Sequence, residues 1–234
     1  MKQQGSLFRK VSMTMLTLLI QLSTGYTQNT DYYRNITVEN YRQERLFNDT
    51  LDFNNIDLNR LNAVLFFVTS EIRLKQNLQP LQYSPELEKA ATMHSRDMVV
   101  HDFFSHTNPF NHKRETPNNR ATITGITNPF IAENIAEDFG LQYKSGDNVY
   151  VMGKGEFSYR PEGKLIPPRT YLSLAESFLK RWMNSPEHKK NIISSNALQM
   201  GCGTYFFTDP EFNSMPTFMA TQNFQWYEKI KLLQ

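Results

Sequence analysis

The sequence places histidine and carboxylate side chains in three short segments that lie far apart along the chain. The segments are Phe104-Ser105-His106, Ala132-Glu133-Asn134-Ile135-Ala136 and Trp182-Met183-Asn184-Ser185-Pro186-Glu187-His188. Imidazole nitrogens and carboxylate oxygens are, besides cysteine thiolates, the usual ligands of zinc, and they also hydrogen-bond polar ligands. If the fold brings the segments together, His106, Glu133 and His188 share one cleft that could bind a divalent cation or a polar molecule.

A fourth histidine, His94, has a different setting. Ser84-Pro85-Glu86 supplies an N-cap residue, a proline at the first helical position and an acid in the first turn, which predicts a helix to about residue 100. His94 shares one face of this helix with Leu87, Ala91 and Met98. We therefore expect His94 to be a core residue with one hydrogen-bonded nitrogen, not a ligand.

His188 is predicted to lie in the first turn of a short helix. Ser185-Pro186-Glu187 repeats the pattern of cap, proline and acid just before it. The positive end of the helix dipole disfavours imidazolium and would keep His188 neutral, whereas the neighbouring Glu187 acts in the opposite direction. The sequence leaves the net sign open.

The start of the chain has the order of a secretory signal peptide. Lys2, Arg9 and Lys10 precede an apolar run of about a dozen residues from 11 to 22, too short for the ~20 residues of a membrane-spanning helix. We therefore expect a signal peptide over 1–25, no transmembrane anchor in the mature chain, and a secreted, extracellular or periplasmic protein. Without these three cations, Lys+Arg falls from 25 to 22 against 23 Asp+Glu, which argues against a nucleic-acid partner.

Two segments, residues 26–55 and 137–169, differ in composition from the rest of the chain. Residues 26–55 are polar and show no sustained periodicity, which predicts a solvated leader or linker before a domain at 56–230; the alternative is an arm in which Tyr41, Leu46 and Phe47 pack on that domain. Residues 137–169 contain a predicted hairpin with Gly153-Lys154-Gly155 at its turn. It would either rim the cleft and select ligands or be a surface decoration.

Helices and strands are both expected in the main domain. Helices are predicted after Asp57 and from Thr170, and two strands are predicted near the end of the chain, at about 198–207 and 218–226. The strands favour an antiparallel sheet covered by helices. Cys202, the single cysteine, lies in the first of these strands, where we expect a buried small apolar side chain that forms no disulfide.

Six segments in this order resemble the CAP superfamily, the secreted domain shared by cysteine-rich secretory proteins, antigen 5 and pathogenesis-related proteins. Besides the three opening segments, the matching stretches are Leu81 to Met98, Met200-Gly201-Cys202-Gly203 and Thr221-Gln222-Asn223-Phe224. The resemblance covers about residues 58–226 and is closest to bacterial-type members. It implies an α+β fold: a three-layer α-β-α sandwich with a central antiparallel sheet and a large cleft.

The resemblance also carries over three of four cleft residues. Two histidines and two glutamates line the cleft in eukaryotic members and can bind zinc; His106, Glu133 and His188 match three of them. The position of the second glutamate is Ser185 here; Glu187 could substitute for it, although bacterial members usually have glycine at that position. The family disulfides are absent. A zinc site formed by His106 and His188 is therefore an open expectation.

Three functions remain open from the sequence. The first is a binding module whose cleft holds a lipid, glycan, peptide or divalent cation from outside the cell or from the cell envelope. The second is a metal-dependent, peptidase-like hydrolase that uses Glu133 and His188 as catalytic residues, although the helical H-E-x-x-H arrangement is missing. The third is a structural role, in which Glu133 and the two histidines hold the loops of the cleft together.

Overall fold

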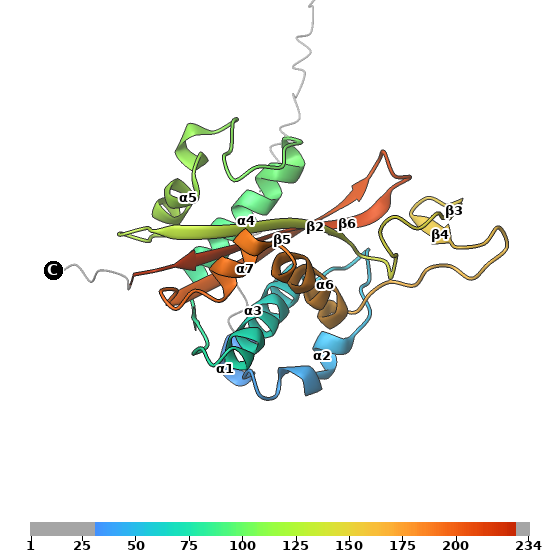
Figure 1. The fold of residues 1–234 in the computed structure, drawn as a ribbon. Coiled ribbons are helices and arrows are strands. Elements are labelled where there is room, and N and C mark those ends of the chain that lie inside the picture. Colours follow the sequence, from blue (N-terminus) through green and yellow to red (C-terminus); the bar gives the residue numbers. More distant parts are fainter. Residues whose placement is uncertain (1–30, 228–234) are drawn as a thin grey trace, which may run out of the picture.

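A four-stranded sheet forms the middle of the molecule in the computed structural model, which describes residues 31–227 (Figure 1). In spatial order its strands are β1 (Gln82–Tyr83), β5 (Gln199–Asp209), β6 (Met215–Gln225) and β2 (Ile131–Phe139). The three long strands are antiparallel as expected. The short β1 pairs with the start of β5 in parallel, so the sheet is mixed at that edge.

Helices cover both faces of the sheet and confirm the predicted three-layer sandwich (Figure 1). One layer contains α4 (Pro85–Val100) and α5 (Pro117–Thr124). The other contains α3 (Leu58–Lys75), α6 (Tyr171–Met183) and α7 (Pro186–Ile192). Because both faces are covered, every residue of the central strand β6 is buried.

The helices begin where their caps predict. Ser84 Oγ accepts a hydrogen bond from the backbone N–H of Leu87 at the start of α4, and Thr170 caps α6 through the N–H of Ser173. Ser185 is the N-cap residue of α7 but makes no side-chain capping bond, so its hydroxyl is not used to hold that helix.

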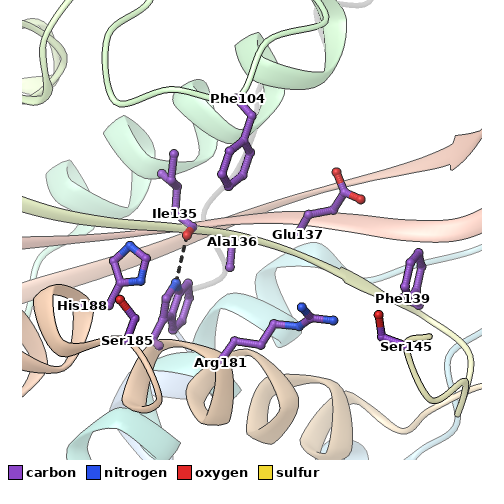
Figure 2. A pocket seen from close by; sticks show the side chains of 10 residues that line it. Phe104, Ile135, Ala136, Glu137, Phe139, Ser145, Arg181, Ser185 and His188 are labelled. Atoms are coloured by element: carbon purple, nitrogen blue, oxygen red, sulfur yellow. Dashed lines mark hydrogen bonds between the residues drawn. The ribbon is translucent and has the colours of Figure 1, made fainter.

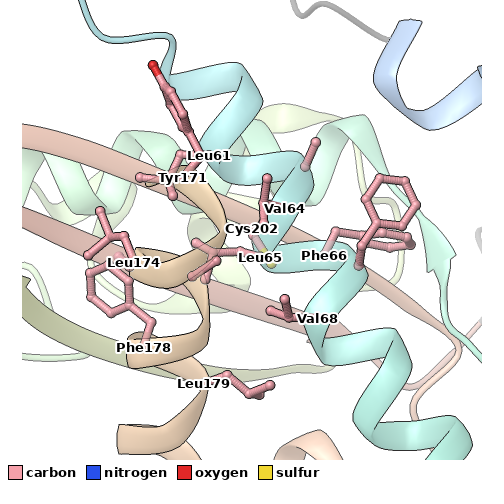
Figure 3. Close-up of a cluster of buried hydrophobic side chains, with 14 of the residues drawn as sticks. Leu61, Val64, Leu65, Phe66, Val68, Tyr171, Leu174, Phe178, Leu179 and Cys202 are labelled. Atoms are coloured by element: carbon pink, nitrogen blue, oxygen red, sulfur yellow. The ribbon is translucent and has the colours of Figure 1, made fainter. Parts of the chain in front are cut away.

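The core on the α3 side joins α3, α6 and β5 (Figure 3). Cys202 lies within it and is fully buried, which confirms the expected apolar role. Burial raises the pKa of the Cys202 thiol, so this sulfur is not an activated nucleophile.

The segment from 31 to 55 corrects the expectation of a solvated linker. It forms α1 (Asp31–Asn35), a 3-10 turn (Tyr41–Gln43) and α2 (Arg45–Asn48), and it packs on the layer of α3 and α6. Tyr41 and Phe47 are fully buried, as the alternative arm prediction requires, whereas Leu46 is exposed. Composition did not predict this packing, because only a few widely spaced apolar residues anchor an otherwise polar segment.

The inserted hairpin forms a small sheet of its own beyond one end of the main sheet (Figure 1). Its strands are β3 (Tyr150–Gly153) and β4 (Glu156–Ser158), and Phe157 anchors it in a separate apolar cluster with Leu141 and Met215. The predicted signal peptide at 1–25 lies outside the described residues. Within residues 31–227, no helix combines the length and apolar character needed to cross a membrane.

Candidate functional site

Glu133 is held in a buried network that links β2 to α5 and to the loop after α4. Its Oε1 accepts from Nδ1 of His106 at 2.9 Å and from Nη2 of Arg120 at 3.0 Å, and Arg120 also reaches Oε2 at 2.8 Å. Both Arg120 and Glu133 side chains are almost fully buried, whereas the His106 side chain is 49% exposed. The first two predicted residues therefore meet, but around an arginine that the sequence interpretation did not include.

The carboxylate has little remaining hydrogen-bonding capacity. With the Asn223 amide nitrogen turned toward it, Asn223 donates to Glu133 Oε2 at 3.0 Å and accepts from the backbone N–H of Ala91. Burial alone would raise the pKa of Glu133, but the hydrogen bond from His106 and the charge of Arg120 hold it below its usual value. These contacts favour the ionised carboxylate and leave its oxygens surrounded by donors.

Arg120 also ties the surrounding loop to the carboxylate. Its Nη1 donates to the carbonyls of Arg114 and Glu115, and its Nη2 donates to the carbonyl of His106 at 3.0 Å. The helix that carries Arg120, α5, has a capping box at Thr116 and a left-handed C-cap at Gly125. The run Thr116-Pro117 with a glycine eight residues later was the sequence signal that could have located this helix.

His94 lies below the network as a buried residue, which confirms its predicted core position. Its Nε2 pairs with the carbonyl of Ser105 at 3.0 Å and lies 3.6 Å from Glu133 Oε1, while its Nδ1 has no hydrogen-bond partner in the described part of the chain. Burial lowers the pKa of His94 to about 4, so the ring is neutral at ordinary pH.

His188 and Ser185 line a surface cleft of about 510 Å³ beside this network (Figure 2). The other walls come from the loop after α4, β2, the insertion and α6. They are formed by Phe104, Ile135, Ala136, Glu137, Phe139, Ser145, Arg181 and Trp182. Five of the ten lining residues are apolar and five carry a polar or charged group, so the cleft offers apolar surface together with hydrogen-bonding groups.

The cleft residues are positioned by contacts with β2. Nε1 of Trp182 donates to the carbonyl of Ile135 at 3.2 Å, the bond drawn in Figure 2. The amide of Asn134 donates to the backbone carbonyl of His188 at 3.2 Å and so fixes the start of α7 beside β2. The imidazole of His188 is therefore presented to the cleft by its own main chain, independently of Glu133.

The sequence left open whether the surroundings of His188 favour its neutral or its charged ring, and the structure favours the neutral ring. Partial burial and, second, the nearby charge of His106 lower the pKa of His188, which favours the neutral ring. Glu187 is exposed and does not line the cleft. The sequence interpretation did not single out Arg181, whose Nη2 pairs with Asp138 at 2.9 Å on the wall of the cleft.

The predicted metal ligands do not combine into a ligand cluster. Within the part of the chain that the structure describes, no group of three or more His, Cys, Asp or Glu side chains is arranged to hold a metal ion. At Glu133 the guanidinium of Arg120 already lies against both oxygens, where a cation would have to approach. This donor set does not fit zinc.

Comparison with known proteins agrees with the architecture and the motifs. The family model described as "Cysteine-rich secretory protein family", CAP, matches residues 66–224. "Uncharacterized protein YkwD" of Bacillus subtilis is 29% identical over 137 residues, which are 58% of this chain and 39% of that protein. The chain therefore spans less than half the length of this relative.

Two solved structures are also similar. An extracellular protein containing a SCP domain from Bacillus anthracis is 22% identical, with a TM-score of 0.48 over 72% of this chain and 41% of that one. An outer surface protein from Borrelia burgdorferi is 18% identical, with a TM-score of 0.47 over 74% of this chain and 97% of that one. With the family model matching well over half of its length, this chain belongs to the cysteine-rich secretory protein (CAP) family.

Proposed function

We propose that this protein is a secreted binding module whose cleft, lined by His188 and Ser185, holds an amphipathic ligand from the cell surface or its surroundings. The proposal rests on one contrast: the Glu133 carboxylate is occupied by hydrogen bonds in a buried network, whereas the His188 ring faces an open cleft. Glu133 uses both oxygens on Arg120, His106 and Asn223. His188 instead presents a ring that favours the neutral state to a hollow that offers apolar surface.

The shape of the cleft favours an extended ligand. Phe104 and Glu137 line not only this cleft but also a neighbouring hollow of about 560 Å³, so the two hollows adjoin. Ser145 brings the inserted segment to the wall, which supports a role of the insertion in ligand choice. A glycan, a peptide or a lipid with an apolar body and a hydrogen-bonding group near His188 would suit this surface.

The same geometry argues against the hydrolase alternative. Glu133 would have to accept a proton or a metal ion, but its pKa is lowered and Arg120 covers it. Calorimetric titration with zinc, on the wild type and on His106→Ala with His188→Ala, tests this point. We expect no specific heat in either protein; a wild-type heat that the double substitution abolishes would contradict the metal-free proposal.

Binding itself is tested with a screen of lipids, glycans and peptides against the mature domain. Trp182 lies on the cleft wall and is one of only two tryptophans, so its fluorescence reports occupancy. Ser185→Phe should fill the cleft and abolish the signal, because the Ser185 side chain makes no capping bond that the change would break. Asn184→Phe, next to it but exposed and outside the cleft, is the matched control. Equal binding by both variants would reject this cleft as the site.

A further inference from the structure

We infer that a second pocket, separate from the cleft and lined by other residues, binds a small organic anion with an apolar body. The pocket has a volume of about 400 Å³ and lies between α4, the first residue of α3 and β5. It shares no lining residue with the cleft, so its occupancy can be tested independently of the proposed function.

Two glycines of β5 bring α4 into direct contact with the strand next to this pocket. A Cβ on Gly201 would lie 2.0 Å from the backbone nitrogen of Glu88, and a Cβ on Gly203 would lie 2.0 Å from that of Thr92. α4 therefore rests directly on the strand at these positions. Side chains alternate along a strand, so Tyr205 is the next residue on this face and the first with a side chain to separate strand and helix. A hollow opens there, with Tyr205 in its wall.

The hollow reaches the solvent because β5 is an edge strand at this point. β1 pairs only with Gln199 and Met200, so on that side the rest of β5 has no neighbouring strand in the described sheet. A ligand can therefore enter along the edge of the sheet without displacing a secondary-structure element.

Three cations and no carboxylate line the pocket. Lys89 and Arg96 are seven residues apart on one face of α4, and both are exposed. Neither has an ion-pair partner within residues 31–227. Arg114 is the third cation and pairs with Asp97 through Nη1 at 3.0 Å. The pocket therefore carries an excess of positive charge, which attracts an anion.

The rest of the lining selects among anions. Leu58, Met93 and Tyr205 present apolar surface beside the cations. An inorganic anion would leave this surface uncovered, and a neutral apolar molecule would leave the cations without a partner. An aromatic or branched sulfonate or carboxylate satisfies both, and a volume of about 400 Å³ is within the usual range for small-molecule sites.

NMR with methyl-labelled methionine and naphthalenesulfonate as the probe tests the inference directly. The Met93 methyl resonance should shift on titration, whereas those of Met98 and Met219, which line the separate hollow beside the cleft, should not. Naphthalenemethanol, which has the same rings without the charge, and inorganic sulfate should each bind at least about tenfold more weakly. Binding should also weaken between about 0.05 M and about 0.5 M salt.

Charge variants give the decisive comparison. Lys89→Gln with Arg96→Gln should raise the Kd for naphthalenesulfonate about tenfold. Lys180→Gln with Lys190→Gln removes the same charge from exposed positions on α6 and α7 and should leave the Kd unchanged. An unshifted Met93, equal affinity for the neutral analogue, or equal effects of the two variant pairs would overturn the inference.

Discussion

Replacing Arg120 with methionine should destabilise the protein more than any change of an exposed arginine. The side chain is fully buried and donates to both oxygens of Glu133 and to the carbonyls of His106, Arg114 and Glu115. Its loss leaves a buried carboxylate without its counter-charge. Removing one partner of a buried ion pair costs about 3–5 kcal/mol, which is a large fraction of a total stability of about 5–15 kcal/mol.

Urea unfolding of three variants measures this cost. Arg42 is the matched control, because its guanidinium also pairs with two carboxylates, Glu71 and Glu176, but its side chain is 41% exposed. Arg42→Met should cost less than about 1 kcal/mol. Adding Glu133→Gln to Arg120→Met should restore at least about 1 kcal/mol, because the unpaired charge is then removed.

The measured losses of stability show whether the hydrogen bonds between Arg120 and Glu133 contribute strongly to the stability of the fold. If Arg120→Met lost no more stability than Arg42→Met, the argument that Arg120 and Glu133 form the structural anchor of the cleft would be refuted. A double variant less stable than Arg120→Met alone would equally refute the claim that the unpaired carboxylate is the source of the loss.

Three further changes test other parts of the structure. Burial raises the pKa of Glu88 to about 7 from 4.5, although the hydrogen bond from Tyr33 opposes this; the folded state therefore holds its proton longer, and the contribution of Glu88 to stability should fall by up to about 3 kcal/mol as pH rises from 4.5 to 7. The lowered pKa of His94, about 4, makes stability rise with pH over the same range in both proteins, so unfolding curves should show the wild type losing up to about 3 kcal/mol relative to Glu88→Gln. Gly203→Ala should cost about 1–3 kcal/mol in urea unfolding and displace α4, because its Cβ would collide with the backbone at Thr92; a neutral result would show that α4 moves freely. Phe47→Ala should cost about 3–5 kcal/mol in the same assay, since its ring is fully buried; a loss under about 1 kcal/mol would mean that the segment is not part of the fold.

Local signals in the sequence predicted the elements that local interactions define. The pattern Ser84-Pro85-Glu86 located α4 because a cap, a proline and an acid act within one turn. It also placed Ser185 at the start of α7, although the hydroxyl there makes no capping bond. The hairpin was located by its glycine turn; strands expected at 149–152 and 156–159 are β3, shifted by one residue, and β4, one residue shorter.

Interactions between distant segments could not be predicted from the same signals. Arg120 has the same side chain as any surface arginine, and its burial follows only from packing α5 against β2, which carries Glu133. For His188 the helix dipole favoured the neutral state and Glu187 opposed it, and both of these influences are local in the sequence. In the fold, partial burial and the charge of His106 are the causes that lower its pKa, and both depend on tertiary structure.

The packed segment from 31 to 55 changes where this domain can be cut. The family match begins at residue 66, and composition suggested a boundary near 56. A protein shortened to residue 56 would expose the faces of α3 and α6 that Tyr41, Phe47 and Leu51 now cover, and one shortened to residue 66 would also lose the first part of α3. Truncations intended to isolate the domain should therefore keep this segment. A protease that released it would expose one side of the hydrophobic core to solvent.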